Sequence, residues 1–151
     1  MPEPHWTAYI SAFLTPIIAI LAALIAYRQW QIARSKLKFD LLDRRMAVYD
    51  AAIHFIAGVL IENKVTIESL LRFRAGVRAT KWLLNSDIHL YLNTELWDKV
   101  REFHHIGKAL EGMPVGDERT KKVNRQDEIL KWLTGQQDAI DKMFDKYLAI
   151  E

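Results

Sequence analysis

The uncharged segment Trp6 to Tyr27, WTAYISAFLTPIIAILAALIAY, decides the fold of this chain of 151 residues. The hydrocarbon core of a bilayer, about 30 Å thick, needs about 20 apolar residues in a helix. The segment has that length. Aromatic residues flank both of its ends: Trp6 and Tyr9 at the first, Tyr27 and Trp30 at the second. Because such rings settle at the headgroup layers, the sequence predicts a transmembrane helix over residues 6–27.

The composition narrows the classes of function. The net charge is +2, which is too small to indicate a nucleic-acid partner. Cysteine is absent, which excludes disulfides, thiol nucleophiles and thiolate metal sites. The four prolines lie at positions 2, 4, 16 and 114, so most of the chain lacks strong helix breakers. We therefore expect an all-α fold.

The residues around the apolar segment predict its orientation. Residues 1–5 contain no Lys or Arg, and the apolar core is too long for a secretory signal peptide. The basic residues follow the segment: Arg28, Arg34, Lys36 and Lys38. Basic residues next to a span stay in the cytoplasm. We expect a short tail at 1–5 outside the membrane and residues 28–151 in the cytoplasm. The same basic side chains could contact anionic headgroups, each contributing about 1 kcal/mol.

The faces of the predicted span differ in side-chain size. Small residues follow one face: Ala8, Ala12, Thr15, Ala19, Ala22 and Ala26. Bulky residues follow another: Ile10, Leu14, Ile17, Leu21 and Leu24. Hydroxyl side chains lie beside the small face: Thr7, Ser11 and Thr15. Small faces let helices pack closely in lipid, which favours a homo-oligomer. A pore lined by the hydroxyls and a monomeric anchor both stay open as alternatives.

An apolar stripe follows the span. No Pro or Gly occurs between Ile17 and Ala57, so the helix can continue into water. Its apolar residues recur at steps of three and four: Phe39, Leu42, Met46, Tyr49, Ile53, Ile56 and Leu60. A helix with so broad an apolar face is expected to bury it in a bundle.

Further helices are expected between residues 66 and 147. Three side chains are placed to cap helix starts: Thr66, Thr94 and Asp117. We expect the helix that begins after Thr66 to reach Leu84, and Gly112 to end the next one. Gly135 is a weak point within the last helix. The sequence thus predicts a transmembrane helix that continues into an antiparallel cytoplasmic bundle of about four helices.

One stretch, Gln29 to Asp50 (QWQIARSKLKFDLLDRRMAVYD), carries a resemblance. It is similar to a recurrent pattern in small bacterial membrane-anchored proteins, in which an apolar span leads into a QW segment, then KLxxDLxDRR and VY. The resemblance implies a bacterial or phage source, hence the bacterial inner membrane as the expected location, and an all-helical cytoplasmic part. It implies no activity, so no catalytic residue is transferred from it.

Two short patterns could carry chemistry. Glu102 and His105 have the Glu-x-x-His spacing of helical di-iron bundles, but the sequence holds no second copy. We therefore expect no metal and no cofactor. Arg101 and His105 resemble the Arg-x4-6-His signature of HEPN-type ribonucleases, with a gap that is one residue shorter. They are weak catalytic candidates. His54 and His89 are expected to be hydrogen-bonded interior or boundary residues.

Three functions follow from these observations. The first is a membrane-anchored interaction or scaffold protein, not an enzyme, which self-associates through its span. The second is an oligomeric pore or membrane effector of a bacterial anti-phage system, for example one linked to CRISPR. The third is a membrane-tethered HEPN-like RNase. The expected partners are the lipid bilayer, further copies of the chain and an unidentified cytoplasmic protein, and nucleic acid is not expected to bind.

Overall fold

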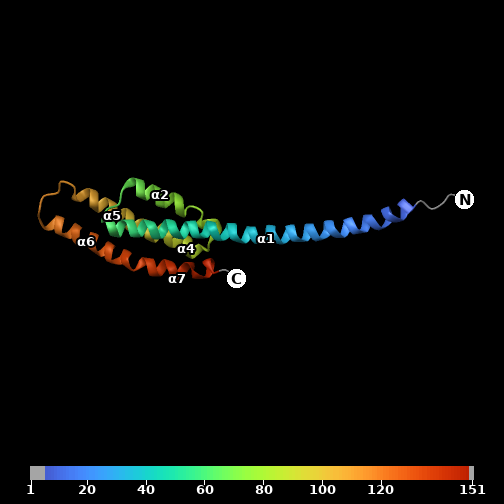
Figure 1. Ribbon diagram of the computed structural model, residues 1–151. Helices are drawn as coiled ribbons and strands as arrows, with labels where there is room; N and C mark the ends of the chain where they lie inside the picture. The colour runs from blue at the N-terminus through green and yellow to red at the C-terminus, as the bar shows by residue number, and fades with distance from the viewer. Residues whose placement is uncertain (1–5, 150–151) are drawn as a thin grey trace. The chain divides into compact units, whose positions relative to one another are not determined.

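The computed structural model describes residues 6–149, and every regular element within that range is helical. The elements in order are α1 (Trp6–Glu62), α2 (Ile67–Val77), α3 (Thr80–Leu83), α4 (Ser86–Leu90), the π-helical segment η1 (Tyr91–Glu95), α5 (Leu96–Leu110), α6 (Asp117–Thr134) and α7 (Gln136–Leu148) (Figure 1). The all-α prediction is confirmed. The chain divides into two compact units, Met1–Asp40 and Leu41–Glu151, and the predicted tail at 1–5 lies outside the described residues.

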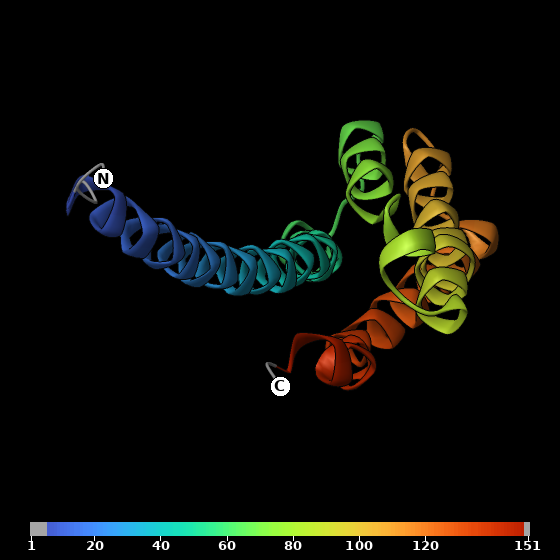
Figure 2. The same ribbon diagram turned by 90° about the vertical axis from the view of Figure 1, so that its right-hand side faces the viewer.

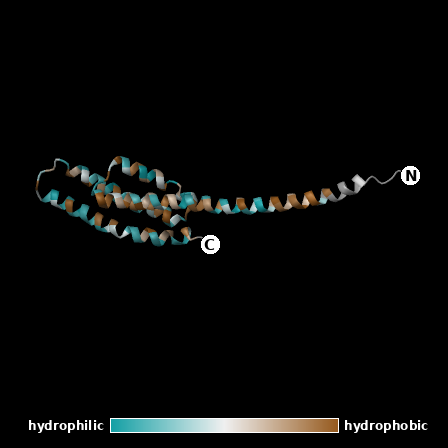
Figure 3. Ribbon diagram, viewed as in Figure 1, coloured by the Kyte–Doolittle hydropathy of each residue, from teal (hydrophilic) through white to brown (hydrophobic). Residues whose placement is uncertain are grey.

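The first unit consists of the N-terminal part of α1. Every residue from Pro16 to Asp40 is exposed, including Ile20 (61%) and Leu24 (56%). Figure 3 shows mostly hydrophobic colour on the described start of this stretch, followed by more hydrophilic residues. A search of the described residues finds one helix, within Pro16–Glu62, that is long and apolar enough to cross a membrane. Unlike the core helix of a soluble protein, residues 16–40 include none that is buried.

The second unit begins with the C-terminal part of α1, where Ile56 is the fully buried member of the predicted stripe and Tyr49, Ile53 and Leu60 are partly buried. Val48, Ala52 and Ile56 are each 2% exposed or less. The prediction of a fully buried stripe is wrong at its beginning, because Phe39 and Met46 are exposed.

A single hydrophobic cluster forms the core of the second unit. Phe55 and Phe73 stack with ring centroids 4.6 Å apart, and Phe73 also lies 6.5 Å from the Trp97 ring. These contacts join α1, α2 and α5, and Figure 2 shows α2 and α5 side by side. Burial of each such side chain stabilises the fold by about 1.5–3 kcal/mol. The remaining fully buried large residues include Ile88, Leu92, Leu96, Phe103, Ile129, Leu133, Ile140 and Phe144.

The start of α2 follows the predicted cap. Thr66 Oγ1 accepts a hydrogen bond from the Ser69 amide at 3.1 Å, and Ser69 Oγ accepts one from the Thr66 amide at 3.0 Å. The prediction that this helix reaches Leu84 is wrong, since α2 ends at Val77. The buried Thr80 hydroxyl donates to the Val77 carbonyl at 2.8 Å, and such side-chain bonds compete with the helical ladder.

The other two predicted caps are wrong. Thr94 lies inside η1, and α5 follows η1 without interruption, so there is no free helix start for its hydroxyl to cap. Gly116 occupies the cap position of α6, and Asp117 lies in the first turn, where its charge favours the helix dipole. The helix end was predicted correctly: Gly112 follows α5 in the left-handed region, with φ of 79°.

A loop separates α5 from α6, and a single residue, Gly135, separates α6 from α7. Figure 1 shows α5 and α6 running in opposite directions on either side of a loop. Arg119 holds this loop, because its guanidinium donates to the Leu110 and Met113 carbonyls at 3.0 and 2.8 Å. The predicted weak point at Gly135 is a break in the helix, and α7 begins directly after it.

Candidate functional site

The DRRxxVY motif, residues 43–49 of α1, contacts other helices of the second unit. Arg45 Nε donates to the Leu83 carbonyl at 3.2 Å, and its guanidinium lies 5.4 Å from the Tyr147 ring. The Tyr49 hydroxyl donates to Asp141 Oδ1 at 2.8 Å, and this bond raises the pKa of Tyr49. Val48, which lies between Arg45 and Tyr49 in the sequence, is buried. These residues tie α1 to α3 and α7, so the motif has a packing role.

Arg101 and His105 line one open hollow of about 490 Å³ on α5 and α6. Both side chains are exposed, and Arg101 Nη2 lies 3.5 Å from Asp98 Oδ1. Lys122 lines the same hollow. The fold thus brings the two catalytic candidates together. Within residues 6–149, however, no hydrogen bond joins them or orients His105 as a general base would require.

Glu102 pairs with Arg125, whereas its Glu-x-x-His spacing suggested a metal site shared with His105. Its carboxylate accepts two hydrogen bonds from the Arg125 guanidinium, at 2.6 and 3.1 Å. This arrangement lowers the pKa of Glu102. A metal held by Glu102 and His105 would have to displace Arg125. Among the described side chains, no group of three or more His, Asp or Glu residues is placed to hold a metal ion.

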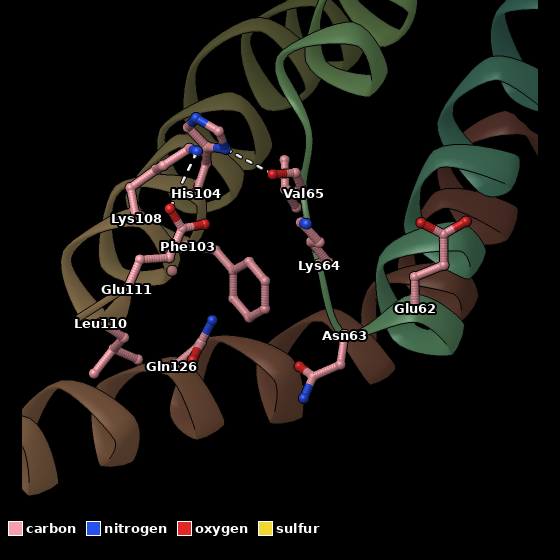
Figure 4. Close-up of a pocket in the computed structure, with 11 residues that line it drawn as sticks. Glu62, Asn63, Lys64, Val65, Phe103, His104, Lys108, Leu110, Glu111 and Gln126 are labelled. Atoms are coloured by element: carbon pink, nitrogen blue, oxygen red, sulfur yellow. Dashed lines mark hydrogen bonds and ion pairs between the residues drawn. The ribbon is translucent and has the colours of Figure 1, made fainter. Parts of the chain in front are cut away.

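A second hollow of about 400 Å³ lies where the loop after α1 meets α5 and α6 (Figure 4). His104 Nδ1 lies 2.6 Å from the Val65 carbonyl oxygen. Since a carbonyl can only accept, Nδ1 carries the hydrogen and donates it. Lys108 Nζ lies 3.4 Å from Glu111 Oε2 at the rim. His104 therefore holds the loop against α5. Its acceptor is a backbone atom 39 residues away, so no pattern in the sequence indicated this role.

The two lone histidines have different surroundings. His89 is half-buried, and its Nδ1 lies 2.8 Å from the Thr80 hydroxyl and 3.1 Å from Asn93 Nδ2. The boundary prediction is confirmed for His89. It is wrong for His54, which is exposed because its face of α1 points away from the core.

His54 lines the largest of these hollows, a groove of about 670 Å³ between α1 and α2. We call it the α1–α2 groove. Its walls are mostly small or apolar: Ala47, Ala51, Phe55, Gly58, Phe73 and Gly76. Charged side chains of both signs stand at its rim: Asp50, Glu62, Lys64 and Arg72. The sequence analysis missed this groove, because its small residues were not part of the apolar stripe.

The residues expected to meet lipid are exposed wherever their side chains are described. This holds for the small-face residues Ala19, Ala22 and Ala26, and for the basic residues Arg28, Arg34, Lys36 and Lys38. The Arg34 guanidinium lies 5.6 Å from the Trp30 ring centroid. The other expected residues have side chains outside the described part of the structure: Thr7, Ala8, Ser11, Ala12 and Thr15.

Comparison of the chain with protein-family models, curated proteins and solved structures finds no match.

Proposed function

We propose that this chain is a membrane-anchored interaction protein. Its first unit spans the bilayer, and its second unit is a cytoplasmic helical bundle that other proteins contact. The observation that carries the proposal is the exposure of every residue from Pro16 to Asp40. Each exposed Ile or Leu would gain about 1.5–3 kcal/mol on transfer from water to hydrocarbon. A bilayer is a medium that surrounds such a helix on all sides.

The distribution of charge supports an orientation. The four basic residues after the span would lie on the cytoplasmic side of a bacterial inner membrane, with the N-terminus outside. Arg34 stacked on Trp30 matches this position, since both side chains have an apolar body and a polar tip. The second unit would then meet cytoplasmic partners.

Membrane fractionation tests the anchor, and cysteine labelling tests the orientation. The chain has no cysteine, so one introduced thiol gives an unambiguous signal. We expect the protein in the membrane fraction after a carbonate wash and extraction only by detergent. A membrane-impermeant maleimide applied to intact cells should leave Ala149→Cys unlabelled and label it after lysis. Recovery in the soluble fraction without detergent would contradict the anchor, and labelling of Ala149→Cys in intact cells would contradict the orientation.

We propose that the span self-associates through its small face. Ala19, Ala22 and Ala26 are the described members of that face. Their replacement by Ile should separate the helices, because close approach in lipid depends on small side chains. The matched control replaces Ile17, Leu21 and Leu24 by Val on the bulky face. The measurement is the mass of the protein in detergent. A monomeric wild type would contradict self-association.

The pore is the alternative membrane function. It needs a ring of copies with hydroxyls toward its axis, and the alternation of a small and a bulky face along one helix is compatible with ring packing. Purified protein in liposomes would then release a trapped ion, and Ser11→Leu would reduce that release. Absence of leakage from liposomes that contain an assembled oligomer would leave the anchor without a pore.

A further inference from the structure

The α1–α2 groove is lined by a glycine from each of its two helices, Gly58 from α1 and Gly76 from α2. A methyl group at Gly76 would lie 2.5 Å from Ala51 Cβ, so the packing of α2 on α1 requires a glycine there. A methyl group at Gly58 would meet no atom within 4 Å. Packing within the chain thus explains Gly76 and leaves Gly58 unexplained, although glycine weakens a helix interior.

The residues on the face of α1 that contains Gly58 recur at regular intervals. Ala47, His54 and Ile61 follow one another at seven-residue intervals, and Gly58 lies between the last two. Ile61 is 83% exposed, although it is apolar and adjoins the buried part of the helix. A seven-residue repeat of this kind places its members along one seam of a helix pair. Small residues in such a seam allow the two helices to approach closely.

We propose that the α1–α2 groove docks α1 of a second copy of this chain, with the two helices parallel about a twofold axis. The parallel direction rests on the proposed function, because copies anchored in one bilayer have the same orientation. The seam is isologous, so Ala47 and Gly58, which line the groove, and Ile61, which lies beside it, meet their own equivalents. Gly58 then provides the close approach, and Ile61 is buried against its counterpart.

Charge at the rim of the groove fits this partner. Asp50 and His54 lie one helical turn apart at the groove on α1. The α1 side of the rim carries the acidic residues Asp50 and Glu62, and the opposite side carries Lys64 and Arg72, so an α1 helix that docks against α2 brings acidic residues to a basic rim. The facing rim from α2 carries Arg72, whose guanidinium is paired with Glu68 at 2.8 Å. The rim of each copy is thus of mixed sign, which avoids repulsion between identical surfaces.

Disulfide cross-linking in native membranes tests the seam. A disulfide needs Cα atoms about 5.5–6 Å apart, and the chain contributes no background thiol. We expect Ala47→Cys to give a covalent dimer on mild oxidation, several-fold more than Asp127→Cys. Asp127 lies on α6, is also exposed and does not line the groove. Equal cross-linking of the two variants would overturn the proposal.

Filling the groove provides a second test with opposite effects on folding and docking. Gly58→Leu places a side chain where the chain itself leaves space, and leucine favours the helix. The thermal midpoint of the second unit should therefore stay equal or rise, while cross-linking through Ala47→Cys falls to the level of the Asp127→Cys control. A folded Gly58→Leu variant that cross-links as well as Gly58 would also overturn the proposal.

The two proposals fail separately in these experiments. Loss of Ala47→Cys cross-linking from a protein that stays in the membrane and oligomerises through its span would remove the groove contact alone. Recovery in the soluble fraction would remove the anchor, and a parallel Ala47→Cys dimer in that fraction would still support the seam.

Discussion

Residues 16–40 and 41–62 of α1 belong to one helix, and both contain many apolar residues. In the first stretch every side chain is exposed. In the second, Val48, Ala52 and Ile56 are almost completely buried. The difference follows from pattern more than from content. Apolar residues surround the helix before Arg28, whereas after Leu41 they form a stripe with Asp43, Arg44 and Asp50 outside it. A stripe can be buried by a few helices, but an apolar cylinder needs a surrounding medium.

A charge in each stretch gives the largest expected effect and tests this comparison directly. Ile56→Asp places a carboxylate in a fully buried site, which should cost about 4–5 kcal/mol or more and unfold the second unit. Leu21→Asp should cost about 2.5–3.5 kcal/mol of membrane insertion instead. Limited proteolysis measures the first effect and fractionation the second. If Leu21→Asp unfolded the second unit, or Ile56→Asp left it resistant, the difference between the stretches would disappear.

The second unit also shows how far a sequence predicts its own fold. Local signals were read correctly at Thr66 and Gly112, where a cap and a helix end depend on neighbouring residues. The prediction at Thr94 was wrong, because η1 carries the helix past a residue that otherwise marks a start. The bonds of Arg45 could not be predicted, since its acceptors are backbone carbonyls 38 and 102 residues away.

The candidate sites show the same difference between local patterns and contacts to residues distant in the sequence. Helical spacing predicts that Arg101 and His105 share a face of α5, and both residues line one hollow. It could not show that Glu102 binds Arg125, which lies 23 residues along the chain on a facing helix. The α1–α2 groove was invisible for a related reason. A groove lies where side chains are small or missing. The role of Gly58 can be recognised only when the empty space beside it is known.

A buried polar cluster gives the next largest effect and sharpens the comparison, since the first unit contains no buried group among its described residues. Thr80→Val removes a hydroxyl that contacts the Val77 carbonyl, His89 and Asn93 within 3.1 Å. The partners would be left unsatisfied, at a cost of about 1–3 kcal/mol. Urea unfolding of the protein in detergent, followed by Trp fluorescence, measures the change. Thr120→Val on exposed α6 is the matched control, and an equal shift in both variants would contradict the role of the cluster.

Acidification should affect the second unit more than the proposed anchor. Arg125 lowers the folded-state pKa of Glu102 below its usual value. A depressed pKa stabilises the fold above the unfolded-state value and loses that contribution as the pH falls through the folded-state value. Both partners are more than a third exposed, so solvent screening keeps the contribution of the pair to stability small. Glu102→Gln should remove this part of the acid sensitivity, between the ordinary pKa of 4.5 and the lower folded-state pKa, as measured by unfolding at each pH. Retention of the full slope in Glu102→Gln would contradict the assignment, and membrane recovery should not change with pH.

The smallest expected effect concerns exposed side chains of the second unit. Arg101→Ala with His105→Ala should change the unfolding free energy by no more than about 0.5 kcal/mol, because both residues are on the surface. The same pair decides the RNase alternative, which needs a base within hydrogen-bond reach of the proton it removes. We expect the purified wild type to leave single-stranded and structured RNA intact, and the double variant to behave identically. Cleavage by the wild type that is lost in the double variant, with Lys142→Ala on α7 as an active control, would establish a catalytic site at this hollow and displace the interaction protein as the function. Exposed residues would then differ between the two units in chemistry as well as in polarity, with lipid contact in the first and catalysis in the second.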